Sequence, residues 1–246
     1  RETTFVIEVC AWTHPGLVRK RNEDVIVCPG IVLTDRPESP IVLSPRSIQH
    51  AVFAVVDGMG GHAGGQEASR AIALGLAGNC ADISATLQQL HEGLFDEMRR
   101  RPELSAMGAT AAGIYIADDA VQAFNIGDSR VYTHRTGYLT LVTEDDRDVG
   151  RPGVVTQSLG GTREPMAIEV HTVDLDVVPP FRVLVCSDGL SEVVSFAQIQ
   201  DALDLPTPEH SVRELIDITC QGGAPDNVSV IVIEWTTLES AQGPPN

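Results

Sequence analysis

The stretch AVFAVVDGMGGHAGG, residues 51–65, is the most informative part of the chain. It begins with a run of apolar residues, which predicts a buried strand ending on Asp57. Five glycines and a histidine follow within eight positions, and glycine lets other backbone come close to the end of a strand. A carboxylate placed there usually has a positive partner, which can be a metal ion, an arginine or a cationic substrate.

The composition is that of an acidic globular protein. The chain has 246 residues, 43% of them hydrophobic, which is enough to form a sizeable core. The formal net charge of −17 argues against binding to nucleic acid through a general basic field. No apolar run is long enough to cross a bilayer, so we expect no membrane insertion.

The cysteines suit a reducing compartment. They are five in number, scattered, and without CxxC spacing. We therefore predict reduced, mostly buried thiols in a cytoplasmic protein, and no zinc site. Cys186 lies in a strand-like run and is predicted to be a core residue rather than a nucleophile.

Short strand-like runs alternate with longer helical ones. Strands are predicted at residues 4–9, 51–57, 113–117, 121–126, 130–134, 138–143, 182–188 and 228–235. Residues 135–137 read as the turn of a hairpin. Helices are predicted near residues 66–77, 84–100, 196–203 and 208–220, with Ser195 and Thr207 as N-caps of the last two.

This order of elements favours an α+β fold with mainly antiparallel sheets covered by helices. No linker divides the chain, so we expect residues 1–246 to form one domain with a core from about 4 to 235. Residues 29–49 contain four prolines and read as a surface excursion. The tail 240–246 is expected to be frayed.

Four aspartates stand at the ends of predicted strands: Asp57, Asp128, Asp188 and Asp226. A lone aspartate beside glycine is more often a turn former or a helix cap. Four carboxylates converging at the mouths of strands would not all stay ionised unless cations were present. Oxygen ligands select Mg²⁺ or Mn²⁺, and two such ions about 3.5–4 Å apart suit hydrolysis of a phosphate ester.

Seven motifs occur in the order typical of the metal-dependent protein phosphatases, the PPM or type 2C family, in its bacterial style. They are GLVRKRNED (16–24), VVDGMGGHAGG (55–65), GATAAG (108–113), NIGDSR (125–130), VTQSLGG (155–161), VLVCSDGLSEVV (183–194) and GGAPDNVSVIVI (222–233). The resemblance covers nearly the whole chain. It implies a four-layer α/β/β/α sandwich with two mainly antiparallel sheets, and a metal cleft at one end of the sheets.

The resemblance also implies a set of metal ligands for two Mn²⁺ or Mg²⁺ ions. Asp57 would bridge the ions and the Gly58 carbonyl would be a ligand. The other implied ligands are Glu23, Asp24, Asp188 and Asp226, with Glu23 and Asp24 acting partly through water. Asp128, shared with Asp188, resembles the ligand of a third and weaker metal site.

By the same resemblance, Arg19 grips the substrate phosphate, because a guanidinium matches two phosphate oxygens. The implied reaction is hydrolysis of phosphoserine and phosphothreonine by a metal-bridging water or hydroxide, without a covalent intermediate. The implied partners are phosphorylated proteins and a cognate Ser/Thr kinase in bacterial-type signalling. We expect a monomer.

The sequence departs from the family in two places. Many eukaryotic members of the family carry a histidine two residues after the bridging aspartate, where this chain has Met59. His62 is either the general acid or a structural residue at the start of a helix, and both readings stay open. The family's T-x-D-H-S motif has Asp146 and Arg147 in its last two positions here, and the flap that follows, residues 147–154, is very short.

Two other functions remain as alternatives. A catalytically weak or inactive relative would act as a partner-binding regulatory module, although the acidic ligand positions and Arg19 argue against it. A phosphatase dedicated to one partner would suit the short flap.

Overall fold

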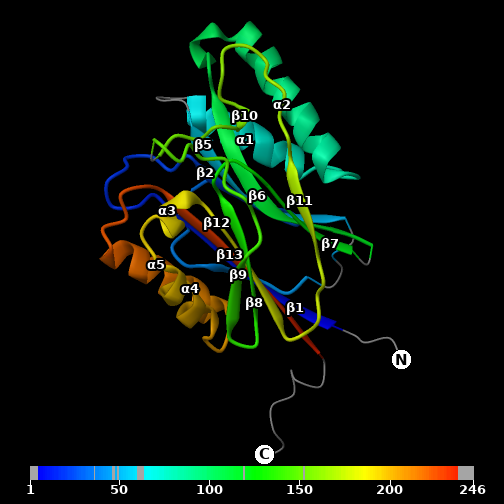
Figure 1. Cartoon of the computed structure of the whole chain (residues 1–246), viewed down its shortest axis with the longest axis vertical. Coiled ribbons are helices and arrows are strands. Elements are labelled where there is room, and N and C mark those ends of the chain that lie inside the picture. Colours follow the sequence, from blue (N-terminus) through cyan, green and yellow to red (C-terminus); the bar gives the residue numbers. More distant parts are fainter. Residues whose placement is uncertain are drawn as a thin grey trace, which may run out of the picture.

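The computed structural model describes residues 5–35, 37–45, 48, 50–59, 64–118, 120–151 and 153–237. In this part of the chain the strands form two antiparallel sheets that pack face to face, with helices on both outer faces (Figure 1). The predicted α+β sandwich is thereby confirmed. The tail 240–246 lies outside the described residues.

The first sheet contains the first and last strands of the chain, β1 and β13, beside strands from its middle part. Its strand order is β4-β1-β13-β12-β8-β9. The bounds are β1 Phe5–His14, β4 Ile41–Leu43, β8 Arg130–Arg135, β9 Tyr138–Leu141, β12 Phe181–Cys186 and β13 Val228–Thr237.

The second sheet is built around the strand predicted from the opening stretch. Its strand order is β11-β7-β6-β5-β2-β3, with β10 pairing to β6. The bounds are β2 Asp24–Cys28, β3 Ile31–Leu33, β5 Ala51–Met59, β6 Gly108–Ala117, β7 Ala120–Ile126, β10 Leu159–Gly160 and β11 His171–Leu175.

The helices divide between the two sheets, as Figure 1 shows. Helices α1 (Gly64–Leu76) and α2 (Ile83–Arg100) pack on the second sheet, followed by the short 3₁₀ turn η1 (Pro102–Leu104). Helices α3 (Asp188–Ser191), α4 (Phe196–Leu203) and α5 (Pro208–Gln221) lie against the first sheet. The molecule therefore has four layers.

Strand β5 is apolar throughout because both of its faces are buried. Val52 and Val56 point toward α1 and α2, whereas Phe53 and Val55 point into the core between the sheets. Successive side chains of a strand alternate between its faces, so a strand between two packed layers needs apolar residues at every position. This explains the unbroken run of residues 51–56.

Predicted helix starts and turns are confirmed. Ser195 and Thr207 cap α4 and α5 by accepting bonds from the backbone N–H groups of Gln198 and His210. The hairpin between β8 and β9 turns on Thr136 and Gly137, which have φ angles of +49° and +80°. Two positive φ angles give the turn whose twist matches the flanking strands.

Five short strands were not predicted: β2, β3, β4, β10 and β11. Two of them, β3 and β4, lie within residues 29–49, so this segment is not wholly irregular. They pair with the edges of different sheets, β3 with β2 and β4 with β1. Runs of two to five residues carry too little periodicity to be distinguished from loops.

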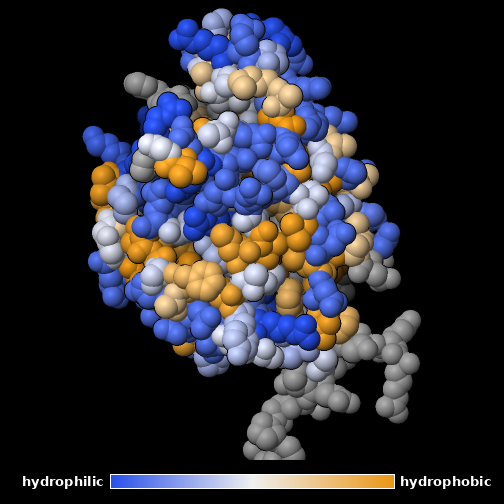
Figure 2. All heavy atoms as spheres, viewed as in Figure 1, coloured by the Kyte–Doolittle hydropathy of each residue, from blue (hydrophilic) through white to orange (hydrophobic). Residues whose placement is uncertain are grey.

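Within the described ranges, no helix is long and apolar enough to span a membrane. On the face drawn in Figure 2, polar residues cover most of the surface and hydrophobic residues gather in a band across its middle.

A buried ion pair fastens α4 to the first sheet and gives a stability prediction. Arg182 on β12 pairs with Glu234 on β13 at 2.7 Å and donates to the Leu203 and Pro206 carbonyls after α4. Arg182→Met leaves Glu234 as a buried charge without its partner, so we expect the free energy of unfolding to fall by about 3–5 kcal/mol. Urea unfolding measures the loss. The double variant Arg182→Met/Glu234→Leu should recover most of it; an equally unstable double variant would contradict this account.

Candidate active site

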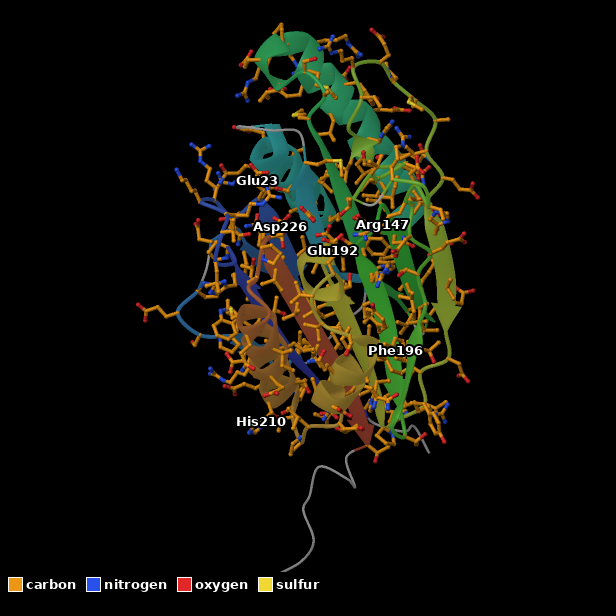
Figure 3. The ribbon with its side chains drawn as sticks, turned by 60° about the vertical axis from the view of Figure 1, so that its left-hand side comes forward. Glu23, Arg147, Glu192, Phe196, His210 and Asp226 are labelled. Carbon is orange, nitrogen blue, oxygen red and sulfur yellow. The ribbon has the colours of Figure 1, made fainter. Side chains whose placement is uncertain are left out.

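A cleft of about 450 Å³ opens at one end of the two sheets. Among the described residues, its acidic lining is Glu23, Asp57, Asp128, Asp188 and Asp226, and its basic lining is Arg19, Lys20 and Arg21. Figure 3 shows Glu23 and Asp226 facing the same region as Arg147 and Glu192, away from the end that carries Phe196. The excess of carboxylates over basic groups makes the cleft strongly negative.

Antiparallel pairing brings the acids to the same end. Asp57 near the end of β5 stands opposite Asp24, the first residue of β2. Asp188 follows β12 and Asp226 precedes β13. These two segments also meet at this end, because Cys186 of β12 pairs with Val230 of β13. Residues far apart in sequence therefore converge because antiparallel strands alternately start and stop at one edge.

Two glycines make room around the end of β5. A Cβ on Gly65 would lie 2.6 Å from Glu23 Oε2 and 2.9 Å from the Gly58 carbonyl oxygen. A Cβ on Gly58 would lie 2.3 Å from the Gly65 carbonyl oxygen. The start of α1 therefore packs directly on the strand end, with the oxygens of Glu23 and Gly58 beside it. The glycines after Asp57 thus let other backbone approach the end of the strand, as the sequence predicts.

A third glycine holds two of the acids together. A Cβ on Gly189 would lie 1.8 Å from the Asn227 carbonyl oxygen, so only glycine permits this contact between α3 and the start of β13. Gly189 follows Asp188, and Asn227 follows Asp226. The contact therefore brings the backbone segments that carry the two carboxylates close together.

The crowded carboxylates raise one another's pKa. Burial raises the pKa of Asp57 well above its usual value, and the charges of Asp24, Asp188 and Asp128 raise it further. Burial, then the charges of Asp128 and Glu192, raise the pKa of Asp188 to about 7. The folded protein thus pays an electrostatic cost for keeping these groups ionised, which bound cations would relieve.

Asp24 lies behind the cleft rather than on its lining. Its side chain is fully buried, and its Oδ2 accepts a 2.8 Å bond from Ser187 Oγ. Burial raises its pKa to about 6, although the hydroxyls of Ser229 and Ser187 oppose the shift. Among the described residues its Oδ1 has no hydrogen-bond partner.

Arginines pair with three of the cleft carboxylates, Asp226, Asp128 and Asp188. Arg19 Nη2 lies 2.5 Å from Asp226 Oδ2, and Arg147 pairs with both Asp128 and Asp188. Over the ranges that the structure describes, no three His, Cys, Asp or Glu side chains form a ready-made metal site. The ligand assignments made from the sequence therefore stay predictions.

Comparison with known families decides the class. The family model described as protein phosphatase 2C matches residues 44–227, three quarters of the chain.

This chain belongs to the protein phosphatase 2C family.

One curated relative of this family member is PstP of Mycobacterium tuberculosis, named a serine/threonine protein phosphatase. It is 30% identical over 264 residues, which cover 98% of this chain and 48% of PstP. The chain thus spans about half the length of this relative.

Two solved structures of the family are similar over their whole length. One is PppA, titled a key regulatory component of T6SS in Pseudomonas aeruginosa, with 29% identity, a TM-score of 0.76, and coverage of 94% of this chain and 100% of PppA. The other is the catalytic domain of PstP in complex with two manganese ions, with 30% identity, a TM-score of 0.76, and coverage of 95% and 100%.

The donor set of this type 2C cleft suits hard divalent cations. Its candidate ligands are all oxygen atoms, which Mg²⁺ and Mn²⁺ prefer. Asp24 Oδ1 is buried without a partner in the described part of the chain, and the missing Cβ of Gly65 keeps two further oxygens clear. The residues present therefore fit Mn²⁺ or Mg²⁺, the ions predicted from the sequence.

Two contributors to the site were missed from the sequence. Asn227 accepts a 2.8 Å bond from the Glu23 N–H and donates to the Pro15 and Arg21 carbonyls, so it holds the loop that carries Arg19. Its place directly after Asp226 was the available signal. Arg147 was noted as a departure from the family motif, but its ion pairs join segments about 20 to 40 residues apart and have no local signature.

The remaining predicted residues are placed as follows. His62 lies outside the described residues, so its role stays open. Met59 lines the cleft in the position where many eukaryotic members of the family have histidine. The short flap folds back by a bridge between Arg147 and Val155, and Val155 also lines the cleft.

Proposed function

We propose that this chain is a Mn²⁺- or Mg²⁺-dependent phosphatase that hydrolyses phosphoserine and phosphothreonine in proteins. The observation that carries the proposal is the cleft itself, in which five carboxylates from both sheets meet Arg19. The similar protein PstP, a serine/threonine protein phosphatase whose catalytic domain binds two manganese ions, supports the same activity.

The ions would be held by Asp57, the Gly58 carbonyl, Glu23, Asp188 and Asp226. When bound, they supply positive charge to phosphate oxygens and lower the pKa of water. The surrounding chain supports these ligands, because Asn227 anchors the loop before Glu23 and Gly189 lets the segment of Asp188 pack closely on the segment of Asp226.

Arg19 is suited to bind the substrate phosphate. Its side chain is 58% exposed at the cleft, and the hydrogen bond and charge of Asp226 raise its pKa, so it stays cationic. A phosphate dianion entering a cleft rich in carboxylates needs such a group, and the guanidinium fork offers two parallel bonds.

The cleft favours water as the nucleophile. Among the described lining residues, Thr110 alone has a side-chain hydroxyl. This hydroxyl is buried and hydrogen-bonded to Ser129 Oγ at 2.8 Å. Cys186 is fully buried in β12, and burial raises the pKa of its thiol to about 12. Neither group is therefore placed to act as a nucleophile, which supports the proposed direct hydrolysis by water.

The location, oligomeric state and partners of the enzyme are proposed from the family and the composition. The enzyme would act in the cytoplasm as a monomer and oppose a Ser/Thr kinase. Its physiological targets would be phosphorylated proteins.

Phosphate release from a phosphothreonine peptide tests the function. We expect turnover with Mn²⁺, none in excess EDTA, and a loss of about 10²–10³-fold in Asp188→Asn, because one anionic ligand in the cleft is neutralised. Asp201→Asn, an exposed change on α4, is the matched control and should behave as the wild type. Metal binding without turnover for any phosphopeptide would instead favour the partner-binding module.

A further inference from the structure

A guanidinium stands where the sequence analysis allowed a third ion. Arg147 Nε lies 2.9 Å from Asp128 Oδ2, and its Nη2 lies 3.3 Å from Asp188 Oδ2. The same Nη2 lies 3.0 Å from Glu192 Oε1. One cation therefore bridges three carboxylates that come from the loop after β7 and from the α3 segment.

We propose that Arg147 replaces a third divalent cation in this enzyme, so that the cleft takes two ions and not three. The inference deepens the proposed function and rests on it for the two remaining ions. It also makes Arg147 a positioning residue for Asp188, since Arg147 bonds one carboxylate oxygen of Asp188 from outside the cleft.

The pairing is well enclosed. The side chain of Asp128 is 4% exposed and that of Arg147 is 23% exposed. A charged pair shielded from water is screened little by salt, and separating it leaves each group with an uncompensated charge. A third ion would have to expel the guanidinium from Asp128 and then remain close to it.

The backbone under Arg147 is held in place by the short flap. The Asp148 N–H bonds to the Val154 carbonyl at 2.9 Å, and the Thr156 N–H bonds to the Asp146 carbonyl at 2.8 Å. These two bonds close the loop around the bridge between Arg147 and Val155. A longer flap is not needed to aim the arginine.

The neighbouring side chains leave Arg147 directed at the cleft. Asp146 Oδ2 accepts from the Gly127 N–H and from Gln157 Nε2. Asp145 is held by Arg130 through both of its oxygens, while its distance to Arg147 Nε is 3.9 Å. Asp145 and Asp146 thus have closer partners than Arg147, and the Arg147 guanidinium pairs with Asp128 and Asp188.

The two arginines of the site act on opposite sides. Arg19 pairs with Asp226, and Arg147 pairs with Asp128 and with Asp188 Oδ2. Within the described ranges no ion pair reaches Asp57 or Glu23. Positive charge from the chain itself is thus placed at the margins, and the centre of the carboxylate cluster is left for the two ions.

The number of Mn²⁺ ions bound at saturation tests the inference. Equilibrium dialysis followed by metal analysis should give two ions per chain for the wild type. Arg147→Ala should bind three, because three carboxylates lose their cation. The double variant Arg147→Ala/Asp128→Asn should return to two. Arg151→Ala is the matched control and should bind two, since Arg151 is 72% exposed on the same loop and, in the described part of the chain, pairs only with Asp148.

A second variant does not depend on the folding of Arg147→Ala. Asp128→Asn on its own should still bind two ions, as the wild type does, because no third ion uses Asp128. A wild type that binds three ions and drops to two in Asp128→Asn would overturn the inference. So would a folded Arg147→Ala that binds only two.

Phosphate release measured on the same samples separates this inference from the proposed function. Metal-dependent turnover with three ions in the wild type leaves the function standing and rejects the role of Arg147. Two ions in the wild type and three in Arg147→Ala, without turnover of phosphopeptides, supports the role of Arg147 and rejects the function.

Discussion

Asp57→Asn is expected to lower metal-dependent phosphate release about 10³-fold and, in EDTA, to raise the melting temperature of the same protein. The loss of activity follows from the position of Asp57 at the centre of the carboxylate cluster. Removing the ligand expected to join both ions forfeits several kcal/mol of transition-state stabilisation, and each 1.36 kcal/mol is about tenfold in rate.

The gain in stability has an electrostatic origin. Asp57 is half-buried at the cleft beside Asp24, Asp188 and Asp128, and desolvation together with their charges raises its pKa. Asparagine keeps the shape and removes one of the repelling charges. A gain of about 1 kcal/mol in the free energy of unfolding corresponds to about 2–4 °C in a domain of this size. With Mn²⁺ in excess the order should reverse, because the wild type gains more from bound ions.

Thermal melts in EDTA and in Mn²⁺, with phosphate release on the same samples, measure both effects. Asp201→Asn again serves as the control for a lost carboxylate outside the cleft. If Asp57→Asn melts below the wild type in EDTA, repulsion among the carboxylates is not a major cost in this fold. If it keeps full activity, Asp57 is not a ligand.

Arg19→Ala should lower kcat/KM about 10²-fold and at the same time tighten the binding of Mn²⁺. The rate falls because a charged, forked donor to the phosphate is removed, and a single such donor contributes roughly 10²–10³-fold. Metal binding tightens because Arg19 competes for Asp226, to which it bonds at 2.5 Å. Arg19→Lys should recover only part of the rate, since an ammonium group cannot make the two parallel bonds.

Steady-state kinetics and Mn²⁺ titration of each variant test these two directions. Arg213→Ala is the matched control, because Arg213 is an exposed arginine paired with Glu209 on α5, away from the cleft. Unchanged kcat/KM in Arg19→Ala would remove Arg19 from substrate binding. Weaker Mn²⁺ binding would show instead that Arg19 supports the metal site.

Much of the framework was predictable from local patterns. The apolar run of residues 51–56 had to be a strand buried on both faces, and Ser195 and Thr207 carry the side chains that cap helices. The Thr136–Gly137 turn suits positive φ angles. Each of these signals is contained in a few consecutive residues, so it survives without knowledge of the rest of the chain.

The short strands were not predictable in this way. Strand β3 has three residues and β4 has three, and each is stabilised by pairing with one longer neighbour. Their conformation depends on an edge supplied from elsewhere in the chain. The same holds for Arg182, whose buried partners come from β13 and from the segment after α4.

Of the candidate site, residue types and spacing predicted the aspartates at the strand ends and the glycines beside Asp57, whereas Arg19 was predicted only from the resemblance to the family. Only the assembled sheets decide how the acids are used: Asp24 is turned inward onto Ser187, and Asp128 is paired with Arg147. The physical reason is that a carboxylate's role depends on its burial and on which cation reaches it. Both are set by contacts between strands and loops that are distant in sequence.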